Sequence, residues 1–108
     1  MDIIRLSHAL GAEVRGVDLA KEVSAADFAT IHRAFLDHSV LVFHGQNITR
    51  DQHIAFSRRF GELDDNDRSP DTDAKYPELT VITTRPKADG TPSESRYTGQ
   101  LWHSDLSF

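Results

Sequence analysis

The stretch Ser39–Phe43 constrains the fold of this chain most strongly, because four apolar residues follow the serine there without interruption. A run of this length is compatible with a β-strand that is buried on both faces. The segments before and after it have the apolar spacing of helices rather than of strands. The middle of the chain is therefore predicted to be a buried strand between two helices.

Both helices have boundary signals in the sequence. The first is expected over about 25–37, where Ser24 stands in the position of an N-cap. The second is expected to begin after Thr49, which forms a capping-box pattern with Gln52. Gly61 suits the C′ position that follows the last turn of this second helix.

The remaining segments are predicted to be strands and loops. Ile3–Leu6 and Ala12–Leu19 indicate two short strands joined by a turn. Leu79–Thr84 is the segment richest in β-branched residues and predicts a further strand. Residues 64–73 predict a polar loop, 86–95 a hairpin-like connection or mobile loop, and 96–108 an extended segment. Two helices followed by a strand-dominated second half predict an α+β fold that is mainly β.

Composition narrows the class of protein. The 108 residues suffice for one modest core, and a net charge of −5 argues against general binding to nucleic acid or an anionic membrane. The absence of cysteine excludes disulfides, iron–sulfur clusters and thiolate zinc sites. No apolar run approaches the length of a membrane span, and the start lacks signal-peptide features. We therefore expect a cytoplasmic protein with no nucleic-acid or membrane partner.

One pair of residues near the end of the sequence has the chemistry of metal ligands. His103 and Asp105 are separated by one residue, so in an extended segment both side chains lie on one face, roughly 7 Å apart. An imidazole and a carboxylate supply two of the three ligands in the 2-His-1-carboxylate triad of non-haem iron sites. Trp102 and Phe108 flank the pair and are expected to wall a dry pocket.

Spacing alone is a weak signal, because a chain with six histidines and many aspartates contains such a pair by chance. The other histidines are poorer candidates. His8 and His53 have no partner at ligand spacing, while His32, His38 and His44 are interpreted as surface, capping or turn residues. The acidic loop lacks the glycine and glutamate of a calcium loop and is interpreted as a solvated loop.

Four segments, in order along the chain, resemble one enzyme family. Trp102–Phe108 is similar to the Trp-His-Ser/Thr-Asp-x-Ser/Thr-Phe signature of the TauD/TfdA family of Fe(II)/2-oxoglutarate-dependent dioxygenases. Gly11–Leu19 resembles the opening strand pair of that family, Val40–Gln46 its buried strand and turn, and Gln52–Gly61 its second helix. Because the resemblance covers nearly the whole chain, it is specific for the family but not for the substrate.

The resemblance implies a fold and a set of cofactors. The fold would be a double-stranded β-helix, or jelly roll, with flanking helices, and residues 1–108 would be the N-terminal part of a single such domain. His103 and Asp105 would be the first two ligands of Fe(II), with 2-oxoglutarate and O₂ as co-substrates. The second histidine ligand and the arginine that anchors 2-oxoglutarate in this family would lie beyond Phe108.

The resemblance also implies substrate-binding positions. Asn66 falls near a histidine that binds sulfonate in taurine-type members, and Ser69 falls near a family tyrosine, which argues against taurine itself. Leu106 and Phe108 fall where members contact the substrate. Gln100–Asp105 is more similar to the phenoxyalkanoate branch. We therefore expect hydroxylation of a small organic anion, phenoxyalkanoate-like or alkyl sulfonate- or sulfate-like, with release of succinate and CO₂.

Two alternatives stay open at this point. One is a non-catalytic remnant or binding module of the same fold, which lacks the third iron ligand. The other is a β-rich binding protein without a metal, in which His103 and Asp105 form a hydrogen-bonded pair. The sequence also leaves homo-oligomerisation open.

Overall fold

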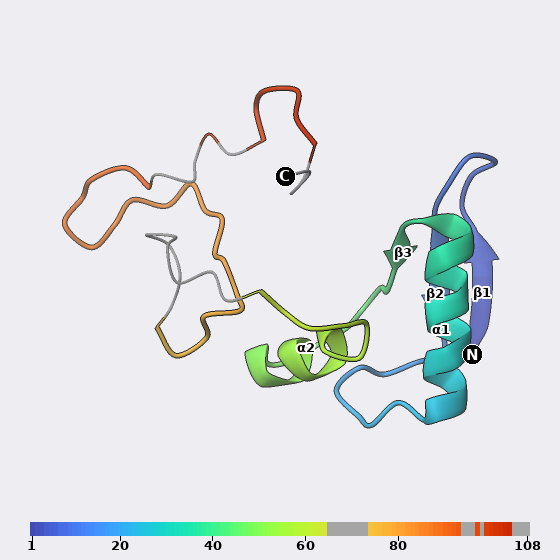
Figure 1. Ribbon diagram of the computed structural model, residues 1–108. Helices are drawn as coiled ribbons and strands as arrows, with labels where there is room; N and C mark the ends of the chain where they lie inside the picture. Colours follow the sequence, from blue (N-terminus) through green and yellow to red (C-terminus); the bar gives the residue numbers. More distant parts are fainter. Residues whose placement is uncertain (65–73, 94–96, 98, 105–108) are drawn as a thin grey trace. The chain divides into compact units, whose positions relative to one another are not determined.

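The structure, a computed structural model, describes residues 1–64, 74–93, 97 and 99–104. Its contacts divide the chain into two compact units, Met1–Glu62 and Leu63–Phe108. The regular elements of the described residues all belong to the first unit and are labelled in Figure 1. They are β1 (Asp2–Arg5), β2 (Ala12–Arg15), α1 (Ala25–His38), β3 (Leu41–Val42) and α2 (Arg50–Ser57).

The three strands form one sheet in the order β1-β2-β3. β1 and β2 are antiparallel, with Ile3 opposite Val14. β2 and β3 are parallel, with Ala12 opposite Leu41. The two strands predicted for the N-terminal segment are therefore confirmed, the first shifted by one residue and the second ending earlier, at Arg15.

The ends of α1 follow from the residues beside it. Ser24 is the N-cap, and its side chain accepts a backbone N–H from the first turn. After His38 the helix ends at Ser39, which has a left-handed φ of 66° and donates its N–H to the Phe35 carbonyl at 2.8 Å. The helix predicted over 25–37 is confirmed.

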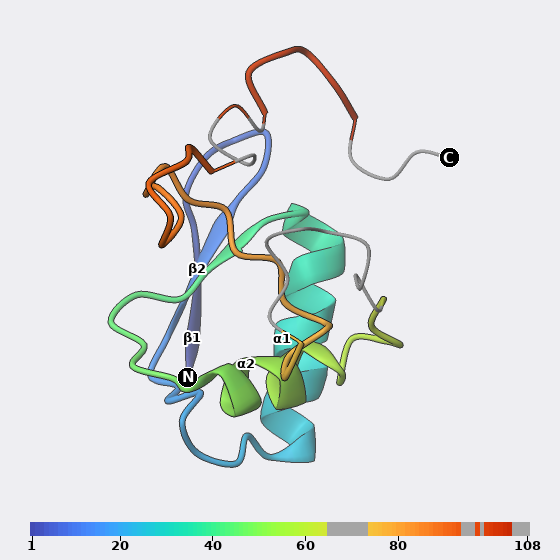
Figure 2. The same cartoon turned by 90° about the vertical axis from the view of Figure 1, so that its left-hand side faces the viewer.

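The first unit has its core between the sheet and α1, which run alongside each other in Figure 1 and in Figure 2. Val14, Leu19, Val23 and Ile31 are buried together there. Ile31 is the largest fully buried side chain among the described residues. Apolar burial of this kind is the dominant favourable term in folding, so these residues define what holds the unit together.

Aromatic rings join α2 to α1. The Phe28 ring centroid lies 4.9 Å from that of Phe60 and 6.1 Å from that of Phe56, and both pairs are edge-to-face. His32 is half-buried and stacks on Phe28 with 6.1 Å between centroids. The interpretation of His32 as a surface residue is therefore wrong, because the helix turns its imidazole into this aromatic cluster.

α2 begins as predicted but ends early. Thr49 Oγ1 accepts from the Gln52 N–H at 3.2 Å, and the Gln52 side chain accepts from the Thr49 N–H at 2.8 Å, which completes the capping box. The last helical residue is Ser57, with Arg58 as the C-cap. Beyond it the backbone tightens into hydrogen bonds between residues three apart. The prediction of Gly61 as the C′ residue is therefore wrong.

Glutamine side chains fasten the loop between β2 and α1. Gln46 Oε1 accepts from the Leu19 N–H at 2.8 Å, and its Nε2 donates to the Val17 carbonyl at 3.1 Å. Gln52 Nε2 donates to the Ala20 carbonyl at 2.9 Å. These bonds satisfy backbone groups that no strand or helix pairs, so the loop has a fixed path.

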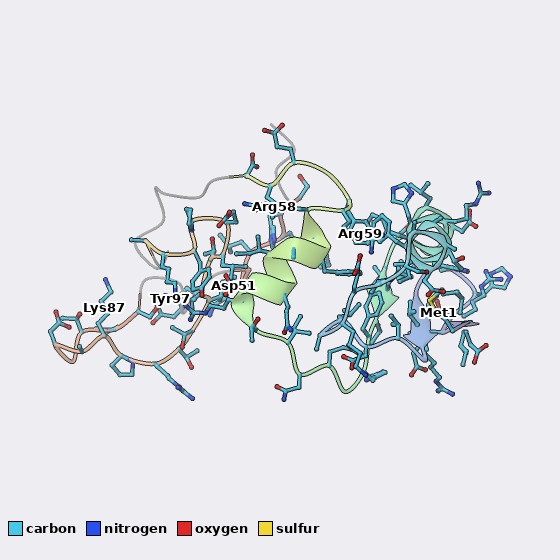
Figure 3. The ribbon with its side chains drawn as sticks, turned by 90° about the horizontal axis from the view of Figure 1, so that it is seen from below. Met1, Asp51, Arg58, Arg59, Lys87 and Tyr97 are labelled. Carbon is cyan, nitrogen blue, oxygen red and sulfur yellow. The ribbon has the colours of Figure 1, made fainter. Side chains whose placement is uncertain are left out.

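Arg59 completes this attachment at the start of α1. Its Nη1 donates to the Val23 carbonyl at 2.6 Å, and its guanidinium lies 4.0 Å from the centroid of the Phe28 ring. Figure 3 labels Arg59 beside Arg58, at the end of α2. The arginine therefore joins the end of one helix to the beginning of the other.

The strand predicted for the second half is wrong for the described residues. Only Thr80 of the segment Leu79–Thr84 lies in a β-bridge, and residues 97 and 99–104 contain no strand. Ile82 is 64% exposed. A β-branched composition favours a strand only where a neighbouring strand pairs its backbone and a packed face buries its side chains.

β3 also differs from its prediction. It comprises two residues that are half-buried, rather than a strand buried on both faces. In the described residues the two helices contain more residues than the three strands, so a mainly β composition is not seen there. The small sheet and two helices agree with the α+β class, while the jelly roll stays a prediction. Neither helix is long and apolar enough to cross a membrane in this described part.

The hairpin-like connection predicted over 86–95 is confirmed where the structure describes it. The Lys87 N–H donates to the Thr91 carbonyl at 2.8 Å, and the Gly90 N–H donates to the Lys87 carbonyl at 2.9 Å. Asp89 Oδ1 accepts from both the N–H and the hydroxyl of Thr91. The turn is therefore held by local bonds.

Candidate metal centre

His103 lies in a loop of the second unit that begins with a turn. The Gln100 N–H donates to the Tyr97 carbonyl at 3.4 Å, and Gly99 within this turn has a φ of 79°. A left-handed φ of this size suits glycine because glycine has no Cβ. The loop is therefore bent just before it reaches the predicted ligand.

The imidazole of His103 turns back onto its own backbone. Its Nδ1 lies 2.7 Å from the Leu101 carbonyl oxygen. Because a carbonyl oxygen only accepts, Nδ1 carries the hydrogen in this bond, and in the neutral ring the lone pair is on Nε2. Metal-binding histidines usually donate their second nitrogen to a carbonyl or carboxylate in this way. His103 therefore fits a role as a metal ligand through Nε2.

The surroundings of His103 differ from the expected dry pocket. Residues Gly99–His103 line an open hollow of about 380 Å³. Leu101 is 83% exposed and Trp102 is fully exposed. The prediction that Trp102 walls a dry pocket is therefore wrong for the second unit as the structure describes it, because no apolar side chain of this loop packs on the indole.

The other predicted site residues lie outside the described residues. They are Asp105, Leu106, Phe108 and Asn66. The described residues alone contain no group of three histidine, cysteine, aspartate or glutamate side chains that could hold a metal ion. The pairing of His103 with Asp105 therefore stays a prediction.

A second charged cluster, on β2 of the first unit, was not predicted. Glu13 is buried, lies 2.7 Å from Arg15 Nη2, and lies 4.0 Å from His44 Nε2. The hydrogen bond from Arg15 holds the pKa of the Glu13 carboxyl below its usual value, against the burial that raises it. The alternation of β2 is the signal that could have found it, because Glu13 and Arg15 share the face opposite Val14.

The remaining histidines do not form a second metal site among the described residues. His53 is exposed and borders an apolar hollow of about 410 Å³ with Phe56 and Phe60. His38 ends α1, in agreement with its interpretation as a capping residue. These positions leave His103 as the described histidine that best matches a metal ligand.

Comparison with known proteins identifies the family. Residues 2–108 match the family described as Taurine catabolism dioxygenase TauD, TfdA family. The chain belongs to this family. The TauD/TfdA resemblance of the four sequence segments is thereby confirmed.

Curated relatives in the TauD/TfdA family are considerably longer than this chain. The alpha-ketoglutarate-dependent 2,4-dichlorophenoxyacetate dioxygenase of Cupriavidus pinatubonensis is 35% identical over 90% of this chain and 37% of its own length. The alkylsulfatase of Acinetobacter baylyi is 31% identical over 100% of this chain and 31% of its own length. The chain therefore spans about a third of the length of these relatives.

Solved structures agree with this assignment. A taurine dioxygenase from Burkholderia xenovorans matches with a TM-score of 0.62 and 34% identity, over 70% of this chain and 26% of that one. The structure of AAD-2 in complex with Mn(II) and N-oxalylglycine matches with a TM-score of 0.58 and 34% identity, over 60% of this chain and 26% of that one. The Mn(II) ion and the N-oxalylglycine are bound in that AAD-2 structure and are not observations on this chain.

Proposed function

We propose that the complete protein is a non-haem Fe(II)/2-oxoglutarate-dependent dioxygenase that hydroxylates a small organic anion. The observation that carries the proposal is the family match over residues 2–108, which includes the His103-Ser104-Asp105 motif. The relatives' names support the reaction class, because they describe alpha-ketoglutarate-dependent oxygenases. The activity is proposed for the complete protein because the chain spans about a third of those relatives.

His103 and Asp105 would hold the iron in this proposal. The hydrogen bond from His103 Nδ1 to the Leu101 carbonyl supports Nε2 as the ligating atom. Asp105 would supply a carboxylate oxygen, and a further histidine outside this chain would supply the third protein ligand. When bound, iron with 2-oxoglutarate supplies the activation of O₂, which couples decarboxylation to succinate and CO₂ with oxidation of a substrate C–H bond.

The substrate is proposed to be a phenoxyalkanoate, with an alkyl sulfate or sulfonate as the second candidate. Relatives named for 2,4-dichlorophenoxyacetate and for (S)-phenoxypropionate support the first class. The alkylsulfatase and a sulfate ester dioxygenase support the second. Asn66, Leu106 and Phe108 are the proposed substrate contacts, and the absence of histidine at Asn66 argues against taurine.

The test uses the complete product of the gene that encodes this chain. The purified protein is supplied with Fe(II), 2-oxoglutarate and O₂, and succinate is measured with phenoxyacetate, (S)-phenoxypropionate, hexyl sulfate or taurine as substrate. We expect substrate-dependent succinate with one of the first three and little with taurine. If the protein does not bind 2-oxoglutarate and produces no succinate with any of these substrates, the result would support the non-catalytic module instead.

The ligand assignment has its own variants. Asp105→Ala should abolish succinate production, because the iron would lose its carboxylate ligand. Asp37→Ala is the control, since Asp37 pairs with Arg33 on the surface of α1 and has no role in the proposed site. Retained turnover in Asp105→Ala would contradict the proposed iron site.

A further inference from the structure

The position of the His103 ring depends on the turn that precedes it. A Cβ atom placed on Gly99 would lie 3.8 Å from His103 Cε1, so the imidazole folds back over the glycine. Its Nδ1 reaches the carbonyl of Leu101, only two residues earlier in the chain. The ring thus lies beside Gly99 through its Cε1 atom and beside the Leu101 carbonyl through Nδ1.

Other glycines with positive φ do not have this relation to a histidine. Gly45 and Gly90 have φ values of 67° and 82°, and a Cβ on either would meet no atom within 4 Å. A Cβ on Gly11 would meet Leu6, and one on Gly16 would meet Met1. Gly99 is therefore the glycine of the described residues whose conformation is linked to an imidazole.

We propose that Gly99 is a positioning residue for His103. Its left-handed conformation bends the loop so that the imidazole donates Nδ1–H to the Leu101 carbonyl, and this fixes the tautomer that presents Nε2 to a metal. The metal-binding part rests on the proposed function. The orientation of the ring is a property of the chain without metal and is testable separately.

The energetic reason lies in the backbone, not in steric contact. At 3.8 Å an added methyl group would make ordinary van der Waals contact with the ring, so space alone permits alanine at residue 99. A Cβ-bearing residue is nevertheless strained at a φ of 79°, and asparagine tolerates this region better than alanine. Alanine should therefore open the turn, while asparagine should largely preserve it.

The first experiment observes the ring nitrogens by ¹⁵N NMR in the metal-free chain. It is made at about pH 8, above the ordinary histidine pKa of about 6.5, with His103→Ala used to assign the signals. The unsubstituted chain should show His103 mainly as the Nδ1–H tautomer. Gly99→Ala should shift it towards Nε2–H, Gly99→Asn should restore Nδ1–H, and the control Gly90→Ala should change nothing.

The second experiment measures the affinity of the complete gene product for Co(II) by its visible absorption. Gly99→Ala should lower this affinity about 10-fold or more, as loss of an orienting partner of a ligand histidine does. Gly99→Asn should recover most of the loss, and Gly90→Ala should bind as the unsubstituted protein does. Backbone amide signals of the first unit check that each variant remains folded.

The outcomes separate the two proposals. A predominantly Nε2–H His103 in the unsubstituted chain, or a Gly99→Ala variant that keeps both tautomer and Co(II) affinity, would overturn the positioning role. Expected tautomers combined with an unchanged Co(II) affinity in His103→Ala would support the orientation but contradict His103 as a ligand. That last result would remove the proposed iron site and leave the turn geometry in place.

Discussion

The two units of this chain are held together by different kinds of interaction. In Met1–Glu62 the structure buries all the hydrophobic core residues that it describes, and alongside local bonds several side-chain hydrogen bonds there connect residues 27 to 36 positions apart. Among the described residues of Leu63–Phe108, Ser93 is the buried one. Several side-chain hydrogen bonds of its described residues, such as that from His103 to Leu101, connect residues two apart.

The packed unit is therefore not the unit that contains the predicted metal ligand. The predicted ligand His103 lies in the unit whose described residues contain no buried hydrophobic side chain. Its orientation in the structure rests on a local contact, the bond from Nδ1 to the Leu101 carbonyl, rather than on packing. Loops that carry function usually have this character, since a rigid scaffold elsewhere positions them. Stability experiments should then respond in the first unit and binding experiments in the second.

The largest effect on stability should come from Ile31→Ala. Ile31 is fully buried between α1 and the sheet, so its loss should cost about 2–5 kcal/mol of unfolding free energy through lost burial and a residual cavity. Ile82→Ala in the second unit is the matched control, because Ile82 is 64% exposed and should change stability by less than about 0.5 kcal/mol. Urea unfolding measures both, and equal effects would contradict the contrast between the units.

A smaller loss is expected from Gln46→Ala. The amide of Gln46 bonds to the Leu19 N–H and to the carbonyls of Val17 and His44, so its removal leaves a buried residue's N–H without that acceptor. An unsatisfied buried group of this kind costs about 1–3 kcal/mol. Asn47→Ala changes the exposed neighbour and should be nearly neutral in the same urea experiment. A neutral Gln46→Ala would show that packing alone fixes the loop.

The sequence predicted the first unit better than the second for a physical reason. Helix patterns and caps are local, so Ser24 and Thr49 could be assigned from their neighbours and are confirmed. Strand formation depends on pairing with another strand, which the sequence of the segment itself does not identify. Leu79–Thr84 has strand composition, yet only Thr80 lies in a bridge.

The site was predicted in chemistry but not in geometry. Residue types and a family signature suggested His103 and Asp105, but no periodic pattern indicated that the His103 ring turns back to the Leu101 carbonyl. That contact follows a glycine with a left-handed φ of 79° at residue 99, and composition carries little information about such an angle. Glu13 was not predicted because only the alternation of β2 indicates that it shares a face with Arg15, and its approach to His44 joins two segments that lie apart in the sequence.

A gain in stability is expected from Ser39→Gly. Ser39 holds a φ of 66° at the end of α1, a strained angle for a residue with a Cβ. Glycine should relieve that strain and raise the unfolding free energy by about 0.5–1 kcal/mol, after the entropy that glycine adds to the unfolded chain. Ser39→Ala retains the Cβ and should show no gain. An equal gain in both variants would mean that the serine hydroxyl, rather than the backbone angle, is unfavourable.

The smallest expected effect is on the pH dependence of stability, which is compared for one carboxyl from each unit. Arg15 holds the pKa of Glu13 below its usual value, so the ionised Glu13 carboxyl stabilises the folded state. This contribution is present above the ordinary glutamate pKa of about 4.3 and is lost as the pH falls through the lowered value. Hydrogen bonds from Thr91 lower the pKa of Asp89 in the same sense.

Glu13 belongs to the packed sheet, whereas Asp89 belongs to a local turn. Glu13→Gln should therefore reduce the loss of first-unit stability that occurs as the pH falls. Asp89→Asn should leave it unchanged. Amide signals of the first unit, followed in urea at decreasing pH, measure both slopes, and a flattened slope in Asp89→Asn would show that the two units unfold together.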